Sequence, residues 1–162
     1  MIRKIVDEIP LIYTFRDVRH GIVYPVFSKS GYVPGAQDGK EYLDAIPDST
    51  RKSIVYWEDH GSNVVSSDTR RWRVSHNLRL IAWMNFDKID QEYDKCVGQL
   101  LYSVPKKFGN TIISYKGQTP KDMSIFSRYS YKEGKQFMTY PYDVVCFKFN
   151  ILYFIPCSQD FL

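Results

Sequence analysis

The fold is decided by residues 72–101, which read WRVSHNLRLIAWMNFDKIDQEYDKCVGQLL. One face at a period of two is mostly apolar from Trp72 to Met84, and Arg73, Ser75, Asn77 and Arg79 lie on the other face, which predicts a long amphipathic strand. The apolar face carries Trp72, Val74, His76, Leu78, Leu80, Ala82 and Met84. A helical spacing of apolar residues follows, with Asp87 as the expected N-cap and Pro105 as the stop. We therefore predict a long strand that leads directly into a helix.

Two further segments predict strands, one from the apolar run at 54–57 and one from a second period of two. Residues 53–59 predict a strand that forms an antiparallel hairpin with the one at 72–84, and the turn-forming residues His60–Asn63 are expected at the tip of a turn over 58–68. Near the C-terminus the pattern predicts a second long strand. Its apolar face carries Val145, Phe147, Phe149, Ile151, Tyr153 and Ile155.

The remaining segments give shorter predictions. Residues 1–12 predict a short helix or an arm, and residues 21–27 and 110–116 predict strands. Residues 28–48 are rich in Gly, Pro, Ser, Asp and Lys, which favours a long connecting loop. Thr119-Pro120-Lys121-Asp122 has the form of a helix start, and residues 129–141 are aromatic and irregular.

Together these elements predict one α+β domain over residues 1–162. We expect a mostly antiparallel β-sheet, one main helix packed on it and long connecting loops. The 16% of aromatic residues, which include 13 Tyr and 10 Phe, agree with a core rich in strands.

Composition narrows the function classes. The net charge of +4 is mild and scattered, so it does not require a nucleic-acid partner. The three cysteines are far apart, which disfavours a zinc site and agrees with a reducing compartment. We expect no signal peptide, and the apolar runs are too short to span a bilayer. The predicted localisation is therefore not in a membrane.

No set of side chains indicates catalysis. His60 follows Glu58 and Asp59, but no nucleophile motif accompanies them. Asp87 and Asp90 are better explained by helix capping than by a metal site. We expect a protein that is not an enzyme and that uses no cofactor or metal.

The cluster Arg70-Arg71-Trp72-Arg73 is the most informative candidate site. Arg and Trp are enriched at protein interfaces, and Arg beside an aromatic ring also suits nucleic acid. The structural alternative is a strand start with Trp72 turned inward and the arginines in solvent. The candidate contact residues for an interface or for nucleic acid are Trp57, Arg70, Arg71, Trp72, Arg73 and Arg79.

A family resemblance rests on an ordered set of segments. They are Ile46-Pro47-Asp48, SIVYWE at 53–58, LRLIAWMN at 78–85 and YDKCVGQLL at 93–101. Their order resembles the tail-terminator, tail-completion and neck proteins of tailed bacteriophages and prophages. The resemblance covers about the middle third of the chain. Residues 28–48 and the aromatic segment after Tyr129 are additions to the family pattern, and the first helix is shorter than is usual there.

The resemblance implies a structural subunit of the virion that forms an oligomeric ring at the head–tail neck or tail. Its partners would be further copies of itself and neighbouring neck, tail or portal proteins, with DNA contact in the ring lumen compatible with this role. The particle would be assembled in the host cytoplasm. The alternative function is a small basic nucleic-acid-binding module that uses Arg70–Arg73 with Trp72.

Overall fold

The computed structural model describes residues 1–28, 31–38, 41–45, 49–120, 125 and 139–156. Its elements in chain order are α1 (Ile2–Glu8), β1 (Val18–Ser28), β2 (Gly31–Asp38), β3 (Glu41–Asp44), β4 (Ser53–Ser67), β5 (Arg71–Asn85), α2 (Tyr93–Ser103), β6 (Lys107–Phe108), β7 (Thr111–Gln118) and β8 (Tyr142–Pro156).

These strands form one sheet in the order β3-β2-β1-β4-β5-β8-β7-β6. β1 runs parallel to β4, whereas the other neighbouring pairs are antiparallel. The predicted α+β class is confirmed in its broad form. The expectation of a mostly antiparallel sheet fits only roughly, because the parallel β1–β4 pair makes the sheet mixed. The main helix α2 is accompanied by α1, which lies within residues 1–12, where a short helix or an arm is expected.

The long strands predicted at 72–84 and near the C-terminus form the centre of the sheet. All 15 residues of β5 pair with β8 without a register shift. One face of this pair carries the alternating residues that the sequence predicts, from Val74 to Met84 on β5 and from Val145 to Tyr153 on β8, and these side chains are buried. Trp72 is the exception, because it lies beyond the core.

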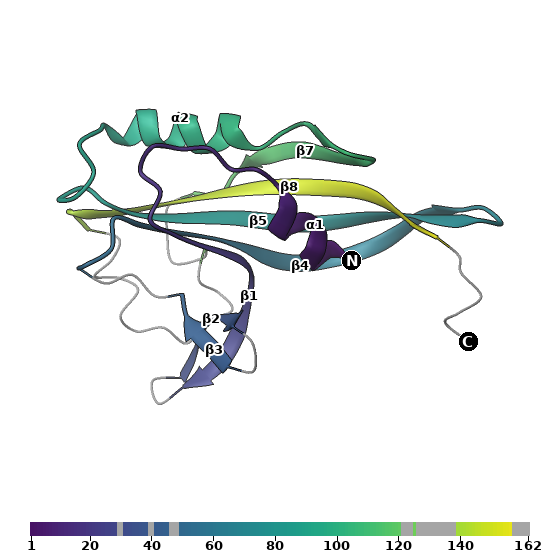
Figure 1. Cartoon of the computed structure of the whole chain (residues 1–162), viewed down its shortest axis with the longest axis horizontal. Helices are drawn as coiled ribbons and strands as arrows, with labels where there is room; N and C mark the ends of the chain where they lie inside the picture. The colour runs from purple at the N-terminus through teal and green to yellow at the C-terminus, as the bar shows by residue number, and fades with distance from the viewer. Residues whose placement is uncertain (29–30, 39–40, 46–48, 121–124, 126–138, 157–162) are drawn as a thin grey trace.

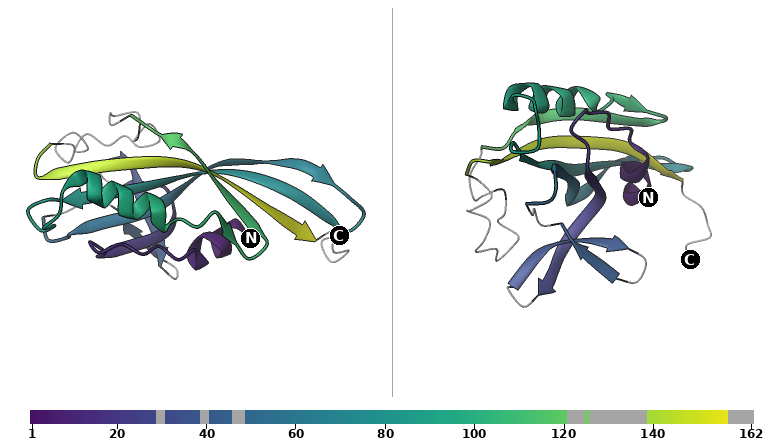
Figure 2. Two further views of the ribbon diagram at one scale, coloured as in Figure 1. Left: turned by 90° about the horizontal axis from the view of Figure 1, so that it is seen from above. Right: turned by 60° about the vertical axis from the view of Figure 1, so that its left-hand side comes forward.

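Each face of the sheet has its own core. Helix α2 lies along one face, and the first helix and the segment after it contribute Val6, Leu11 and Phe15 to the same core (Figure 1). On the other face, Ile81 and Trp83 of β5 pack in a second core with residues of β1, β2, β4 and β8. Figure 2 shows β1, β2 and β3 turned away from the plane of β4, β5 and β8 on that side.

The prediction of a long loop over residues 28–48 is wrong, because the whole of β2 and of β3 lies there. The glycines and prolines that favoured a loop are tolerated for a physical reason. Pro25 lies beyond the last β1–β4 pair, and Pro34 lies before the first β2–β3 pair. Neither proline therefore has to supply an N–H to a second neighbouring strand, and the two prolines pair with each other.

The predicted turn over 58–68 is also misplaced. β4 continues to Ser67, and the chain reverses at residues 68–70. The turn-forming residues from His60 to Asn63 are accommodated inside the strand by a register shift between Asp59 and Ser62. Gly61 has a φ of 97°, which a residue without a side chain adopts at little cost. The predicted antiparallel hairpin itself is confirmed.

The main helix starts later than predicted. Residues 86–88 form a turn after β5, and α2 begins at Tyr93 with Glu92 as the N-cap residue, so Asp87 does not cap the helix. The end of the helix before Pro105 and the short N-terminal helix agree with the prediction. The helix expected after Thr119 and the irregular segment at 129–141 lie largely outside the described residues.

Candidate functional site

The main candidate site is an arm formed by residues 61–73. Every residue from Gly61 to Trp72 is exposed, whereas the preceding half of β4 is buried. The arm extends the sheet past its core at one end of the long axis of the molecule (Figures 1 and 2). The sequence folds this way because the continuous apolar run of β4, which is buried on both faces, ends at Trp57, while the backbone pairing with β5 continues to Ser67.

One edge of the arm is open. β1 pairs with β4 only as far as Val23 and Glu58, and no described strand pairs with that side of β4 from Asp59 to Ser67. An unpaired strand edge presents free N–H and C=O groups, which makes it a template for a strand from another chain. The stretch from Gly61 to Ser67 also contains no charged residue and no proline, the residues that natural edges use to prevent such pairing.

The arm also exposes apolar side chains. Val64 and Val65 are 57% and 56% exposed, and the Trp72 ring is 49% exposed. Phe154 of β8, which pairs with Arg73 near the tip of the arm, is 37% exposed. Within the described part of the chain no second layer covers these side chains, so they remain available to a partner.

Asp68 orders the tip of the arm. Its Oδ1 atom accepts hydrogen bonds of 2.8 Å from the backbone N–H groups of Arg70 and Arg71, and these bonds lower the pKa of the Asp68 carboxyl. Arg71 lies 3.5 Å from Asp68 and also places its guanidinium 4.3 Å from the centre of the Phe154 ring. Arg70 is exposed and makes no ion pair with a described residue.

The structure brings together four of the six predicted contact residues and separates the other two. Arg70, Arg71, Trp72 and Arg73 lie on the arm, with Arg73 half-buried. Trp57 is 0% exposed and belongs to the core, and the Arg79 side chain is only 12% exposed. We therefore withdraw Trp57 and Arg79 as contact residues, because a folded subunit does not present them to a partner.

A polar group of three side chains holds the base of the arm. His76 places Nε2 2.7 Å from Asp59 Oδ1 and Nδ1 3.3 Å from the Tyr153 hydroxyl. When Nε2 donates to the carboxylate, Nδ1 accepts from the hydroxyl, so each polar atom has a partner. Burial raises the pKa of Tyr153, and the charge of Asp59 adds to this. His76 is thus the buried, hydrogen-bonded histidine that its place on the apolar face predicts.

A second polar group lies on the opposite face of β4 and β5. Glu58 is 1% exposed and lies 3.5 Å from Arg79 Nε and 3.2 Å from His60 Nε2. Arg79 also donates a 2.5 Å hydrogen bond to the carbonyl of Ile125. The group ties Ile125 to the sheet, and within the described part of the chain the partner of the His60 ring is the Glu58 carboxylate.

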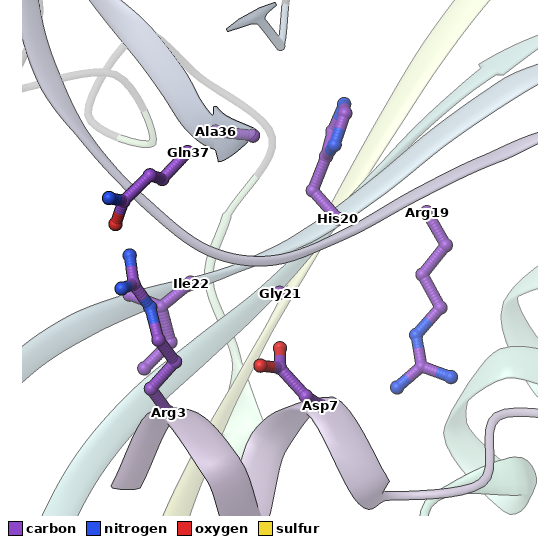
Figure 3. Close-up of a pocket in the computed structure, with 8 residues that line it drawn as sticks. All are labelled: Arg3, Asp7, Arg19, His20, Gly21, Ile22, Ala36 and Gln37. Atoms are coloured by element: carbon purple, nitrogen blue, oxygen red, sulfur yellow. The ribbon is translucent and has the colours of Figure 1, made fainter. Parts of the chain in front are cut away.

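A polar pocket of about 250 Å³ lies where α1 meets β1 and β2 (Figure 3). Its walls include Arg3 and Asp7 of α1 and Gln37 of β2. Arg19 beside it donates to the carbonyls of Val6 and Ile9 at the end of α1, at 3.3 and 2.7 Å. The Asp7 carboxylate lies so close to Gly21 that a side chain there would collide with it.

The pocket was not predicted, because its residues come from three segments and form no motif. Its charged groups already serve the fold, since Arg19 caps the carbonyl end of α1 and Asp7 packs on β1. No group of three or more His, Cys, Asp or Glu side chains suited to a metal occurs among the described residues. The arm therefore remains the stronger candidate.

His20 at this pocket should make stability depend on pH. Burial lowers the pKa of His20 below its ordinary value of 6.5. The unfolded chain then binds a proton at His20 more readily than the folded chain, so stability should fall as the pH decreases through 6.5. We expect the urea midpoint to be lower at acidic than at neutral pH, and His20→Gln should reduce this difference. An unchanged difference in the variant would contradict the assignment.

The described structure is thus an α+β protein with a projecting, open-edged β arm. No family model, no curated protein and no solved structure matches the chain. Among the described helices, neither α1 nor α2 is long and apolar enough to cross a membrane.

Proposed function

We propose that this protein is a structural subunit that assembles with copies of itself into a ring, as at the head–tail neck or tail of a tailed bacteriophage. The observation that supports the proposal best is the arm, which exposes an open β4 edge together with Val64, Val65 and Trp72. A second copy that pairs with this edge would supply backbone hydrogen bonds and cover the apolar side chains.

The proposal includes the partners that such a ring requires. Neighbouring neck, tail or portal proteins would contact its two rims, and DNA would pass through its lumen in a virion assembled in the host cytoplasm. We propose a non-enzymatic role, for which the arm and the sheet suffice. Contacts that close by rotation give rings, and the same contacts that fail to close give filaments.

Light scattering across a concentration series tests the assembly. We expect a discrete oligomer for the unaltered protein and a monomer for Val64→Lys/Val65→Lys, because lysine on a strand edge disfavours pairing. Ile12→Lys is the matched control, since Ile12 is 81% exposed and lies away from the arm, between α1 and β1. A protein that stays monomeric at every concentration, alone and with candidate neck proteins, would contradict the proposal.

The second candidate function is nucleic-acid binding by the arm tip. The exposed Arg70 and Arg71 beside the half-exposed Trp72 ring favour it. We expect single-stranded DNA to bind with an affinity that falls steeply with salt, and Arg70→Glu/Arg71→Glu to abolish the binding in a fluorescence anisotropy titration. Binding that is absent, or that does not change with salt, would exclude this function.

A further inference from the structure

The two ends of the long axis carry opposite charge. At one end, the arm tip holds Arg70, Arg71 and Arg73 against the single acid Asp68. At the other end, residues 87–94 between β5 and the start of α2 form what we call the acidic turn. Its exposed acids are Asp87, Asp90, Glu92 and Asp94.

The separation of these charges follows from β5. This strand of 15 residues begins at the arm tip and ends just before the acidic turn, which places the two about 50 Å apart at roughly 3.3 Å per residue. Figure 1 shows the hairpin tip at the right and the connection from β5 to α2 at the left (Figure 1). The basic arm tip and the acidic turn therefore lie at opposite ends of β5.

The carboxylates of the acidic turn are not neutralised within the described part of the chain. Asp87, Asp90, Glu92 and Asp94 make no ion pair with any described residue. Lys88 and Lys95 are the cations of the same segment, so residues 87–95 keep an excess of two negative charges. Arg51, near the same end, is paired with Asp17 at 3.7 Å.

We propose that copies of this protein associate head to tail, with the arm tip of one copy seated on the acidic turn of the next. This inference rests on the proposed function and assigns the surfaces that meet. Arg70 of the tip and the carboxylates of Asp90 and Glu92 would form the new ion pairs. Because a guanidinium holds a carboxylate through two parallel hydrogen bonds, the contact would also fix the orientation of the copies.

The charges also argue against the symmetric alternative. A two-fold dimer that joins two arms tip to tip would place Arg70 and Arg71 opposite their own copies, and like charges at an interface disfavour association. A head-to-tail contact is heterologous, so it leaves one free tip and one free acidic turn on every open chain. Only a closed ring satisfies both ends of every copy.

Charge reversal of each surface tests the inference in the full-length protein. The arm variant is Arg70→Glu/Arg71→Glu and the turn variant is Asp90→Lys/Glu92→Lys. We expect each variant alone to associate at least about tenfold more weakly than the unaltered protein, because like charges then meet at the contact. Sedimentation velocity, without DNA, gives the masses.

Mixing the two variants is the decisive measurement. A reversed arm then meets a reversed turn, and an unaltered arm meets an unaltered turn, so an equimolar mixture should recover the association. The four substitutions in one chain should do the same. Lys116→Glu/Lys148→Glu is the matched control, since it changes the net charge as the arm variant does at exposed residues of β7 and β8 near the middle of the sheet, and it should leave the mass unchanged.

The outcomes separate this inference from the proposed function. If the reversed variants remain oligomeric, or if neither the mixture nor the fourfold variant recovers, the head-to-tail contact is wrong while self-assembly stands. If the unaltered protein is monomeric, both fail. Arg70→Glu alone provides a milder arm variant that keeps the Arg71–Asp68 contact at the turn, and circular dichroism checks that each variant is folded.

Discussion

Replacing Trp57 with alanine should lower the free energy of unfolding by about 3–5 kcal/mol. The indole is 0% exposed, and its ring lies 5.7 Å from the ring of Phe149 in the core that α2 covers. Alanine would leave a cavity there that the surrounding strands fill only in part. Urea denaturation followed by circular dichroism measures the loss.

Trp72 provides the matched control, because it is the same residue type on the same sheet. Its ring is 49% exposed on the arm, so Trp72→Ala should lower the free energy of unfolding by less than about 1 kcal/mol. The two substitutions should also differ in light scattering, because we expect Trp72→Ala to weaken the proposed assembly through the arm. Similar stability losses at the two positions would contradict the division between core and arm.

Replacing Arg79 with methionine should lower the free energy of unfolding by a similar amount, about 3–5 kcal/mol. Methionine preserves most of the apolar stem of the side chain but leaves Glu58, at 1% exposure, with a buried charge and without its arginine partner. The substitution also removes the hydrogen bond to the carbonyl of Ile125. Chemical denaturation at neutral pH gives the size of the loss.

The double variant Glu58→Gln/Arg79→Met tests whether the cost comes from the Glu58 carboxylate that has lost its arginine partner. With no carboxylate to bury, the variant should recover a large part of the stability that Arg79→Met loses, because a buried pair contributes little beyond its own desolvation. If the double variant is no more stable than the single one, packing around Arg79 rather than charge carries the effect.

The elements that the sequence predicted well are those whose pattern is local and long. β5 and β8 alternate over most of their length, so the faces of Val74 and Phe147 follow from a period of two. The helix α1 follows from the spacing of Ile2, Ile5 and Val6 before Pro10. In each case neighbouring residues contain enough information to fix the element.

The failures arise where distant contacts override local preference. β2 contains Pro34 and Gly35, and only its pairing with β1 makes this segment a strand. The parallel partner of β1 is β4, which lies beyond two further strands in the sequence. Ile81 and Trp83 interrupt the expected polar face of β5 because a second core covers that end of the strand.

Only part of the candidate site could be predicted, because the position of some of its residues depends on contacts that are distant in the sequence. Arg70 to Arg73 are consecutive in the sequence, so they lie close together in any fold. Trp57 and Arg79 resemble contact residues by type, but their place depends on which part of β4 and β5 the core covers. The acidic turn was not predicted as a contact surface, because helix capping accounted for Asp87 and Asp90.

The uninterrupted ladder between β5 and β8 has a mechanical consequence. Its hydrogen bonds lie across the strands, and all 15 residues of β5 take part from the arm end to the opposite end of the molecule. A tension applied between these ends would load the bonds together in shear, whereas a sideways pull would open them one after another. The subunit is therefore built to resist stretching most strongly along the axis on which neighbouring copies would pull.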